Sequence, residues 1–249
     1  MKQPIIPMSF EAFDVMERPF GWKVEYWDGC ARLTPRSVGV KTTINLVPRQ
    51  LAPHHYTLIP VSPDDRDRLL AGYFESFSAS VEFCGWPPES IHESAARNIG
   101  KYFSGTKGEP LSASVIALAP GCPDVVGVAL FIDRPEKGAY LDLLYVRTDF
   151  QRQGVATAML NWAIDRLIKS GFKTLASTYH VCNEPSRLWH HGHGFVDQYD
   201  GYYARLKMSW YQAEIWRRET LGLTDGLGEM KQACDRWASQ ISADWDAFY

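Results

Sequence analysis

The segment from Tyr140 to Gly171 constrains the fold of this chain more than any other. An apolar run over Tyr140–Val146 predicts a buried strand, and a short loop that contains Gly154 follows it. From Ala156 to Ile168 apolar residues recur at helical spacing, and Gly171 suits the residue after a helix end. This order of strand, loop and helix directs backbone N–H groups and a helix N-terminus at one point, which is how proteins hold phosphates.

The loop between this strand and helix carries a recognisable motif. It reads Gln-Arg-Gln-Gly-Val-Ala over residues 151–156. It resembles motif A of the GCN5-related N-acetyltransferases (GNAT), Gln/Arg-x-x-Gly-x-Gly/Ala, with Gln151, Gly154 and Ala156 in register. The strand before the loop and the long amphipathic helix after it are the context that this motif requires.

A second match lies downstream, after a β-branched and aromatic strand predicted over Thr174–Val181. Residues 183–195 resemble motif B of the same family, Asn-x-x-Ala-x-x-x-Tyr-x-x-x-Gly-Phe. Asn183 and the Gly-Phe pair match that pattern, Ser186 replaces the small Ala, and His190 stands at the usual Tyr position.

The resemblance implies a mixed α+β fold, with a central mixed sheet flanked by helices, that binds acetyl-CoA. It implies transfer of the acetyl group to a primary amine by direct attack in a ternary complex. In this family the strand backbone pairs with the pantetheine arm, and the loop amides hold the pyrophosphate. The implied cofactor-binding residues are Leu144, Tyr145, Val146, Gln151, Arg152, Gln153, Gly154, Val155, Ala156, Thr157, Asn183 and Ser186. Asn183 also suits a helix N-cap.

The proton chemistry is less determined than the cofactor. The family's motif-B Tyr often protonates the departing thiolate, so His190 is the candidate general acid, with a residue that lines the channel as the alternative. Tyr145, Tyr179 and Tyr202 are other phenols that could act. Asp142, the only charge in the apolar strand, is the candidate base, and a salt bridge is its structural alternative.

The acceptor amine in this family binds near the first helices of the domain. Glu75 and Glu82 are candidate acceptor-binding carboxylates there, with salt bridges as the alternative. Phe83 and Trp86 could wall a pocket for a cation or an apolar arm, or belong to the core.

Three regions are predicted along the chain: a β-hairpin or meander extension over 1–52, the GNAT domain over 53–210 and a helical extension over 211–249. Alternation around Asp28-Gly29 predicts the hairpin, and 41–47 is expected as its third strand. Residues 62–65 predict a capped helix start, and 202–208 predict the last strand of the domain. The final helix carries aromatic residues that pack on its own domain or form a homodimer contact: Trp237, Trp245, Phe248 and Tyr249.

Composition excludes several classes of protein. A net charge of −3 gives no basic footprint for nucleic acid, and no apolar run is long enough to span a membrane. The five cysteines are scattered, without a Cys-x-x-Cys pair, which argues against a disulfide framework. We therefore expect reduced thiols, a cytoplasmic location and no nucleic-acid or membrane partner.

The sequence suggests two other functions. His190, His191 and His193 suggest a metal site, but no nearby carboxylate or Cys pair completes a ligand set, so no metal is predicted. The missing motif-B Tyr keeps open a non-catalytic acyl-CoA-binding sensor or interaction module on a GNAT scaffold. Small amines and peptide amines are both possible acceptors.

Overall fold

The computed structural model describes residues 1–49, 54–121, 123–135 and 137–246, with side chains placed up to residue 241. The boundary predicted at residue 52, Phe248 and Tyr249 lie outside these residues, as does the side chain of Trp245. No helix among the described residues is long and apolar enough to cross a membrane.

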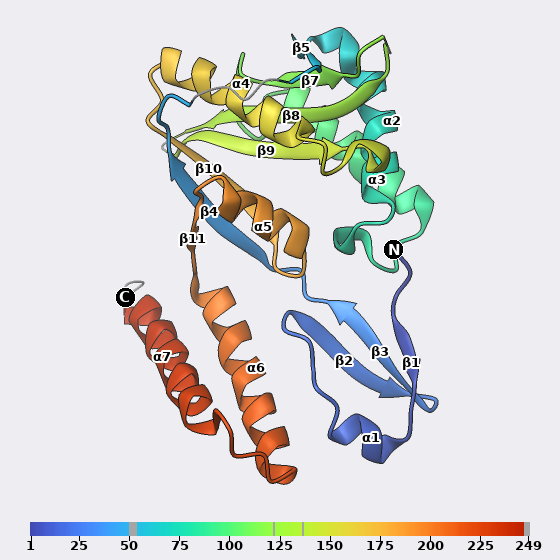
Figure 1. Ribbon diagram of the computed structural model, residues 1–249, viewed down its shortest axis with the longest axis vertical. Coiled ribbons are helices and arrows are strands. Elements are labelled where there is room, and N and C mark those ends of the chain that lie inside the picture. Colours follow the sequence, from blue (N-terminus) through green and yellow to red (C-terminus); the bar gives the residue numbers. More distant parts are fainter. Residues whose placement is uncertain (50–53, 122, 136, 247–249) are drawn as a thin grey trace. The chain divides into compact units, whose positions relative to one another are not determined.

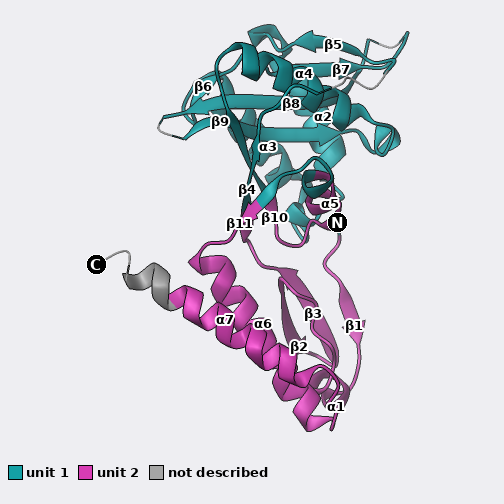
Figure 2. Ribbon diagram, turned by 60° about the vertical axis from the view of Figure 1, so that its left-hand side comes forward, with its two compact units in different colours: residues 1, 41–178, 190–196 teal, residues 2–40, 179–189, 197–249 magenta. Residues whose placement is uncertain are grey.

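The chain forms two compact units, each assembled from separate stretches of sequence (Figure 2). The first contains Met1, 41–178 and 190–196, and the second contains 2–40, 179–189 and 197–249. The units therefore alternate along the chain and do not end at the domain boundary predicted at residue 210.

The larger sheet has eight strands in the order β11-β4-β10-β9-β8-β7-β5, with β6 paired to β8 (Figure 1). Its strands are β4 (Gly39–Asn45), β5 (Thr57–Pro60), β6 (Glu109–Pro110), β7 (Val115–Leu118), β8 (Val125–Arg134), β9 (Gly138–Val146), β10 (Thr174–His180) and β11 (Val196–Gln198). β8 lies inside the sheet between β9 and β7, and its first eight residues are all buried, as expected for a strand covered on both faces.

Helices cover both faces of this sheet. They are α2 (Arg66–Phe77), α3 (Pro88–Phe103) and α4 (Val155–Lys169). Helix α5 (Glu184–Gly192) follows β10 along the chain, and three short 3-10 turns are η1 (Pro63–Asp65), η2 (Val81–Phe83) and η3 (Thr148–Phe150). Val128 and Leu130 join the apolar core formed with α2 and α3. A Cβ on Gly127 would meet Val155 of α4 at 2.8 Å. Since neighbouring strand residues face opposite sides, α4 lies on the other face of the sheet from α2 and α3.

The capped helix start predicted at 62–65 is present. The Asp65 side chain accepts a hydrogen bond from the Ser62 backbone N–H at 2.8 Å, and α2 follows directly. This contact satisfies one of the donors that a helix start leaves open.

The second unit contains a three-stranded sheet in the order β1-β3-β2, made by β1 (Ile5–Pro7), β2 (Trp22–Trp27) and β3 (Cys30–Pro35), with helix α1 (Phe10–Asp14). The predicted hairpin is confirmed: Asp28 and Gly29 have φ of 48° and 70°, the left-handed pair of a tight turn. The third strand expected at 41–47 was assigned to the wrong sheet, because β4 pairs in the larger one. Alternation predicts a strand but does not name its partner.

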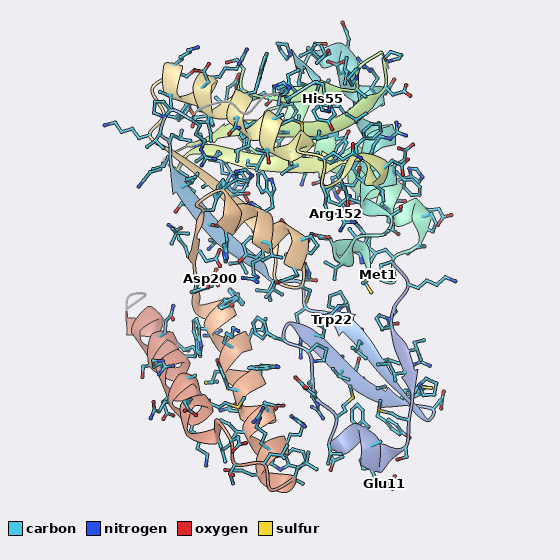
Figure 3. All side chains as sticks on the ribbon, viewed as in Figure 1. Met1, Glu11, Trp22, His55, Arg152 and Asp200 are labelled. Atoms are coloured by element: carbon cyan, nitrogen blue, oxygen red, sulfur yellow. The ribbon has the colours of Figure 1, made fainter. Side chains whose placement is uncertain are left out.

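The strand predicted over 202–208 is wrong, since these residues lie inside α6 (Gly201–Thr220). The Asp200 side chain, at the start of the helix in Figure 3, accepts a hydrogen bond from the Tyr203 N–H at 3.2 Å. This cap and packing against α7 (Leu227–Asp246) outweigh the strand preference of Tyr202 and Tyr203. Trp237 of α7 packs on the Tyr203 ring, with centroids 5.6 Å apart, and the homodimer contact stays a prediction.

Candidate cofactor and acceptor site

Strands β9 and β10 separate along their length. They pair in parallel at Tyr140 and Ala176, and no further pair between them occurs among the described residues. Along its other edge β9 is paired with β8 as far as Val146. The backbone of Leu144–Val146 therefore has a free edge facing away from β8, where an extended ligand could form hydrogen bonds.

The loop after β9 leads into the exposed start of α4. Arg152, labelled in Figure 3, has φ of 59° and Gly154 has φ of 85°, so both adopt the left-handed conformation. The first helical hydrogen bond runs from Ala158 N–H to the Gly154 carbonyl at 2.9 Å. The N–H groups of residues 155–157 precede it and lie at the positive end of the helix dipole.

The space over Gly154 is open. A Cβ built on this glycine would meet no atom within 4 Å. A ligand could therefore approach the backbone at this point, which is the geometry that a diphosphate needs.

Two predicted cofactor side chains brace the loop. The Gln151 amide donates to the Val146 carbonyl at 3.1 Å, and the Gln153 amide donates to the Asp149 carbonyl at 2.7 Å. A third contact comes from a distant segment and was not predicted from the sequence. The Tyr56 hydroxyl donates to the Gln153 carbonyl at 3.2 Å. The side chains of this loop thus fix its shape and leave its N–H groups to bind.

His193 lies beside the first turn of α4. Its Nε2 lies 3.1 Å from Thr157 Oγ1, and the Arg49 guanidinium donates to its carbonyl at 2.6 Å. Burial and, to a lesser degree, the charge of Arg49 lower the pKa of His193. Sequence reasoning considered His193 only as a metal ligand, because nothing in the sequence relates it to Arg49.

His190 does not face an open site. It is 3% exposed, its Nε2 lies 3.0 Å from Ser177 Oγ on β10, and its ring meets Phe195 edge-on. The role of His190 as the general acid stays a prediction, and its burial and its hydrogen bond to Ser177 do not favour it.

Asp142 is likewise a paired carboxylate. Its side chain is 5% exposed, and Lys107 Nζ lies 2.9 Å and 3.0 Å from its two oxygens. It stands between Leu141 and Leu143, which pair with consecutive residues of β8, so it is the extra residue of a β-bulge. The salt bridge given as its structural alternative is observed, and the role of Asp142 as a base stays a prediction.

Two of the candidate phenols are engaged in hydrogen bonds, and the third is exposed. The Tyr145 hydroxyl donates to the Leu69 carbonyl at 3.0 Å, and burial raises the pKa of this residue strongly. In the second unit, the Tyr179 hydroxyl donates to Asp197 at 2.7 Å, and burial raises its pKa as well. Tyr202 is 75% exposed on α6.

The predicted acceptor residues gather around α2 and η2. Glu75 pairs with Arg147, the residue after β9, at 2.9 Å and remains half exposed. Phe83 is buried, and Trp86, 47% exposed, packs edge-on against it. The Tyr73 ring packs on Phe83. Burial, and to a lesser degree the charge of Glu82, raise the pKa of Tyr73. Phe83 is thus a core residue, while Glu75 and Trp86 are accessible.

Asn183 and Ser186 belong to the second unit. The Asn183 side chain accepts a hydrogen bond from the Ser186 N–H at 3.0 Å, which is the N-cap role that its residue type favours. Their contact with the cofactor stays a prediction. Within the described part of the chain, no group of three or more His, Cys, Asp or Glu side chains could hold a metal ion.

The chain is similar to several solved structures at low sequence identity. PaiA N-acetyltransferase from Thermoplasma acidophilum, in complex with coenzyme A, is 20% identical, with a TM-score of 0.47 over 59% of this chain and 93% of its own. The ribosomal-protein-S18-alanine N-acetyltransferase from Escherichia coli is 20% identical, with a TM-score of 0.43 over 58% and 79%. A GCN5-related N-acetyltransferase from Sphaerobacter thermophilus is 17% identical, with a TM-score of 0.48 over 79% and 56%.

No curated protein sequence matches the chain. The family model of the acetyltransferase (GNAT) family matches residues 76–195, which include the open edge of β9, the loop before α4 and the motif-B segment. The resemblance drawn from the two sequence motifs is thereby confirmed, since residues 76–195 match the model of the acetyltransferase (GNAT) family.

Proposed function

We propose that this protein binds acetyl-CoA and transfers its acetyl group to a primary amine by direct attack in a ternary complex. The observation that carries the proposal is the continuous path from the open edge of β9 to the N-terminus of α4. Coenzyme A has an extended amide-containing arm that ends in a diphosphate, and this path offers strand groups followed by helix N–H groups. The coenzyme A present in the PaiA complex agrees with this assignment.

The residues of this chain would bind each part of the ligand differently. The backbone of Leu144–Val146 would bind the arm, and the N–H groups from Gly154 to Thr157 would bind the diphosphate. Arg152 would add positive charge beside the phosphates. Acetyl-CoA would supply the thioester carbonyl that the amine attacks.

The acceptor would approach from the side of α2. Glu75 is the exposed carboxylate there, so we propose that it meets the acceptor ammonium in competition with Arg147. Trp86 would contact the remainder of the acceptor. Since the candidate acid and base residues are buried or paired, positioning would supply most of the rate, and oriented reactants can gain about 7–11 kcal/mol.

One observation favours a second candidate function. At the position where the family places its Tyr, His190 is buried against Ser177. An acyl-CoA-binding sensor or interaction module would need the cofactor path but no proton donor at this point.

A two-stage experiment separates these functions. Titration with acetyl-CoA should raise the melting temperature through preferential binding to the folded state, and no shift at saturation would contradict cofactor binding. Thiol release would then be measured with a panel of small amines and peptide N-termini. Release with at least one amine supports the enzyme, whereas binding without release across the panel supports the sensor.

A further inference from the structure

Tyr56 connects the start of β5 to the loop that precedes α4. It is 7% exposed, and its hydroxyl donates to the Gln153 carbonyl at 3.2 Å, across 97 positions of sequence. No sequence motif covers this residue, and the family match begins twenty residues after it.

The contact fixes one peptide plane of the loop. In a planar trans peptide the carbonyl and the following N–H point in opposite directions. A hydroxyl that holds the Gln153 carbonyl therefore directs the Gly154 N–H away from Tyr56. That N–H is the first of the series that continues into the open start of α4.

The loop needs such support because its conformation is unfavourable. Gln153 lies between Arg152 and Gly154, both with positive φ. The left-handed conformation costs a residue with a Cβ roughly 1–2 kcal/mol, and such conformations persist where surrounding contacts determine them. The amides of Gln151 and Gln153 brace the loop against its own neighbours, whereas Tyr56 attaches it to a strand of the central sheet.

The ring of Tyr56 is held independently of its hydroxyl. The His55 ring lies 5.1 Å from it, and the His54 ring stacks at 6.5 Å. Removal of the hydroxyl alone should therefore leave the ring in place and release only the Gln153 peptide.

We propose that Tyr56 is a positioning residue that presets the Gln153–Gly154 peptide for the diphosphate of coenzyme A, an inference that rests on the function proposed above. Donors held in place before binding lose less entropy when the ligand arrives. Tyr56 should accordingly contribute to the affinity of ligands that contain the diphosphate and not to that of the pantetheine arm.

The test is the variant Tyr56→Phe, with calorimetric titration of coenzyme A, dephospho-coenzyme A and pantetheine. The first two contain the diphosphate and the third lacks it. We expect Tyr56→Phe to weaken the first two by the same factor, about twofold to tenfold, the range of one neutral hydrogen bond, and to leave pantetheine unchanged. The matched control is Tyr26→Phe, because the Tyr26 hydroxyl also donates to a backbone carbonyl, that of Met8 at 3.1 Å.

Four outcomes would overturn the inference. Equal affinities for coenzyme A in Tyr56→Phe and wild type would remove Tyr56 from cofactor binding while the proposed function stands. Equal weakening of all three ligands, or weakening by Tyr26→Phe as well, would assign Tyr56 a general role in stability. Failure of the wild type to bind coenzyme A would instead refute the proposed function, and this inference with it.

Discussion

The loop before α4 and the helix α5 correspond to the two motifs of one family, yet they keep its pattern to different degrees. The loop offers backbone N–H groups, and its side chains at Gln151 and Gln153 serve to hold its shape. In α5 the motif depends on the side chain at position 190, which is a buried histidine bonded to Ser177.

The comparison shows that a function carried by the backbone is easier to infer from sequence than one carried by a side chain. Backbone donors need only the correct φ and ψ angles, which Gly154 reports directly. A side chain needs a partner, an orientation and access, and all three are set by distant residues. The following predictions test this contrast, from the largest expected effect to the smallest.

The largest effect should come from Gly154→Glu. A side chain here would occupy the open space over the loop and place a negative charge where we propose that the diphosphate binds. We expect affinity for coenzyme A to fall at least about a hundredfold, which is roughly 2.7 kcal/mol, measured by calorimetric titration.

The matched control for this variant is Gly171→Glu. Gly171 has φ of 89°, close to the 85° of Gly154, and a Cβ there also meets no atom within 4 Å. Both variants share the cost of a left-handed side chain, but only one blocks the loop. Equal affinities of the two variants for coenzyme A would show that the loop does not bind the diphosphate.

The next effect concerns the pair Asp142–Lys107 on the strand that leads to the loop. Asp142→Asn leaves Lys107 without its counter-charge in a largely buried position, and we expect the free energy of unfolding to fall by about 2 kcal/mol. Coenzyme A affinity and turnover per folded molecule should stay near wild type. Chemical denaturation measures the free energy of unfolding. A loss of turnover at unchanged stability would support Asp142 as a base.

His190→Ala should affect stability rather than chemistry. The variant leaves the Ser177 hydroxyl without this partner, which costs about 1–2 kcal/mol. We expect the pH dependence of turnover to keep its shape, because the imidazole is buried. A pH–rate profile that loses one limb in His190→Ala would reverse the contrast between the two motifs.

The smallest effect should be a pH dependence from His193. Burial and Arg49 lower its pKa in the folded protein below the ordinary value of 6.5. Above that value the residue is neutral in both states and contributes nothing. Below it the unfolded chain binds the proton more readily than the folded protein does, so the stability of the wild type decreases with falling pH.

The variant His193→Asn should not show this decrease of stability with falling pH. We expect the stability of the wild type relative to His193→Asn to be lower at about pH 5.5 than at about pH 8. His191→Asn is the control, since His191 is an exposed residue of α5. An identical pH response in wild type and His193→Asn would contradict the role of burial at His193.

The elements with strong local signals were predictable. Periodic apolar residues and the capping residues Ser62 and Asp65 predicted helices α2 and α4, and Asp28-Gly29 predicted the hairpin. Each of these signals acts over a few residues, so the sequence contains all the information required.

The failures involve partners far apart in sequence. The third strand of the N-terminal extension pairs in the larger sheet, and 202–208 form a helix that packs on α7. Asp142 and Lys107 are 35 positions apart, and Tyr56 lies 97 positions from Gln153. No local pattern specifies such pairs, since they depend on how the sheet and helices assemble.

The sequence by itself determined the resemblance to the GNAT family and the conformation of the loop before α4, because Gly154, its flanking strand and the amphipathic helix act through local backbone geometry. The tertiary structure alone decided which side chains are free. Folding placed Lys107 on Asp142, Ser177 on His190 and Tyr56 on Gln153. Burial and long-range pairing decide the availability of a side chain, and neither is encoded within a motif.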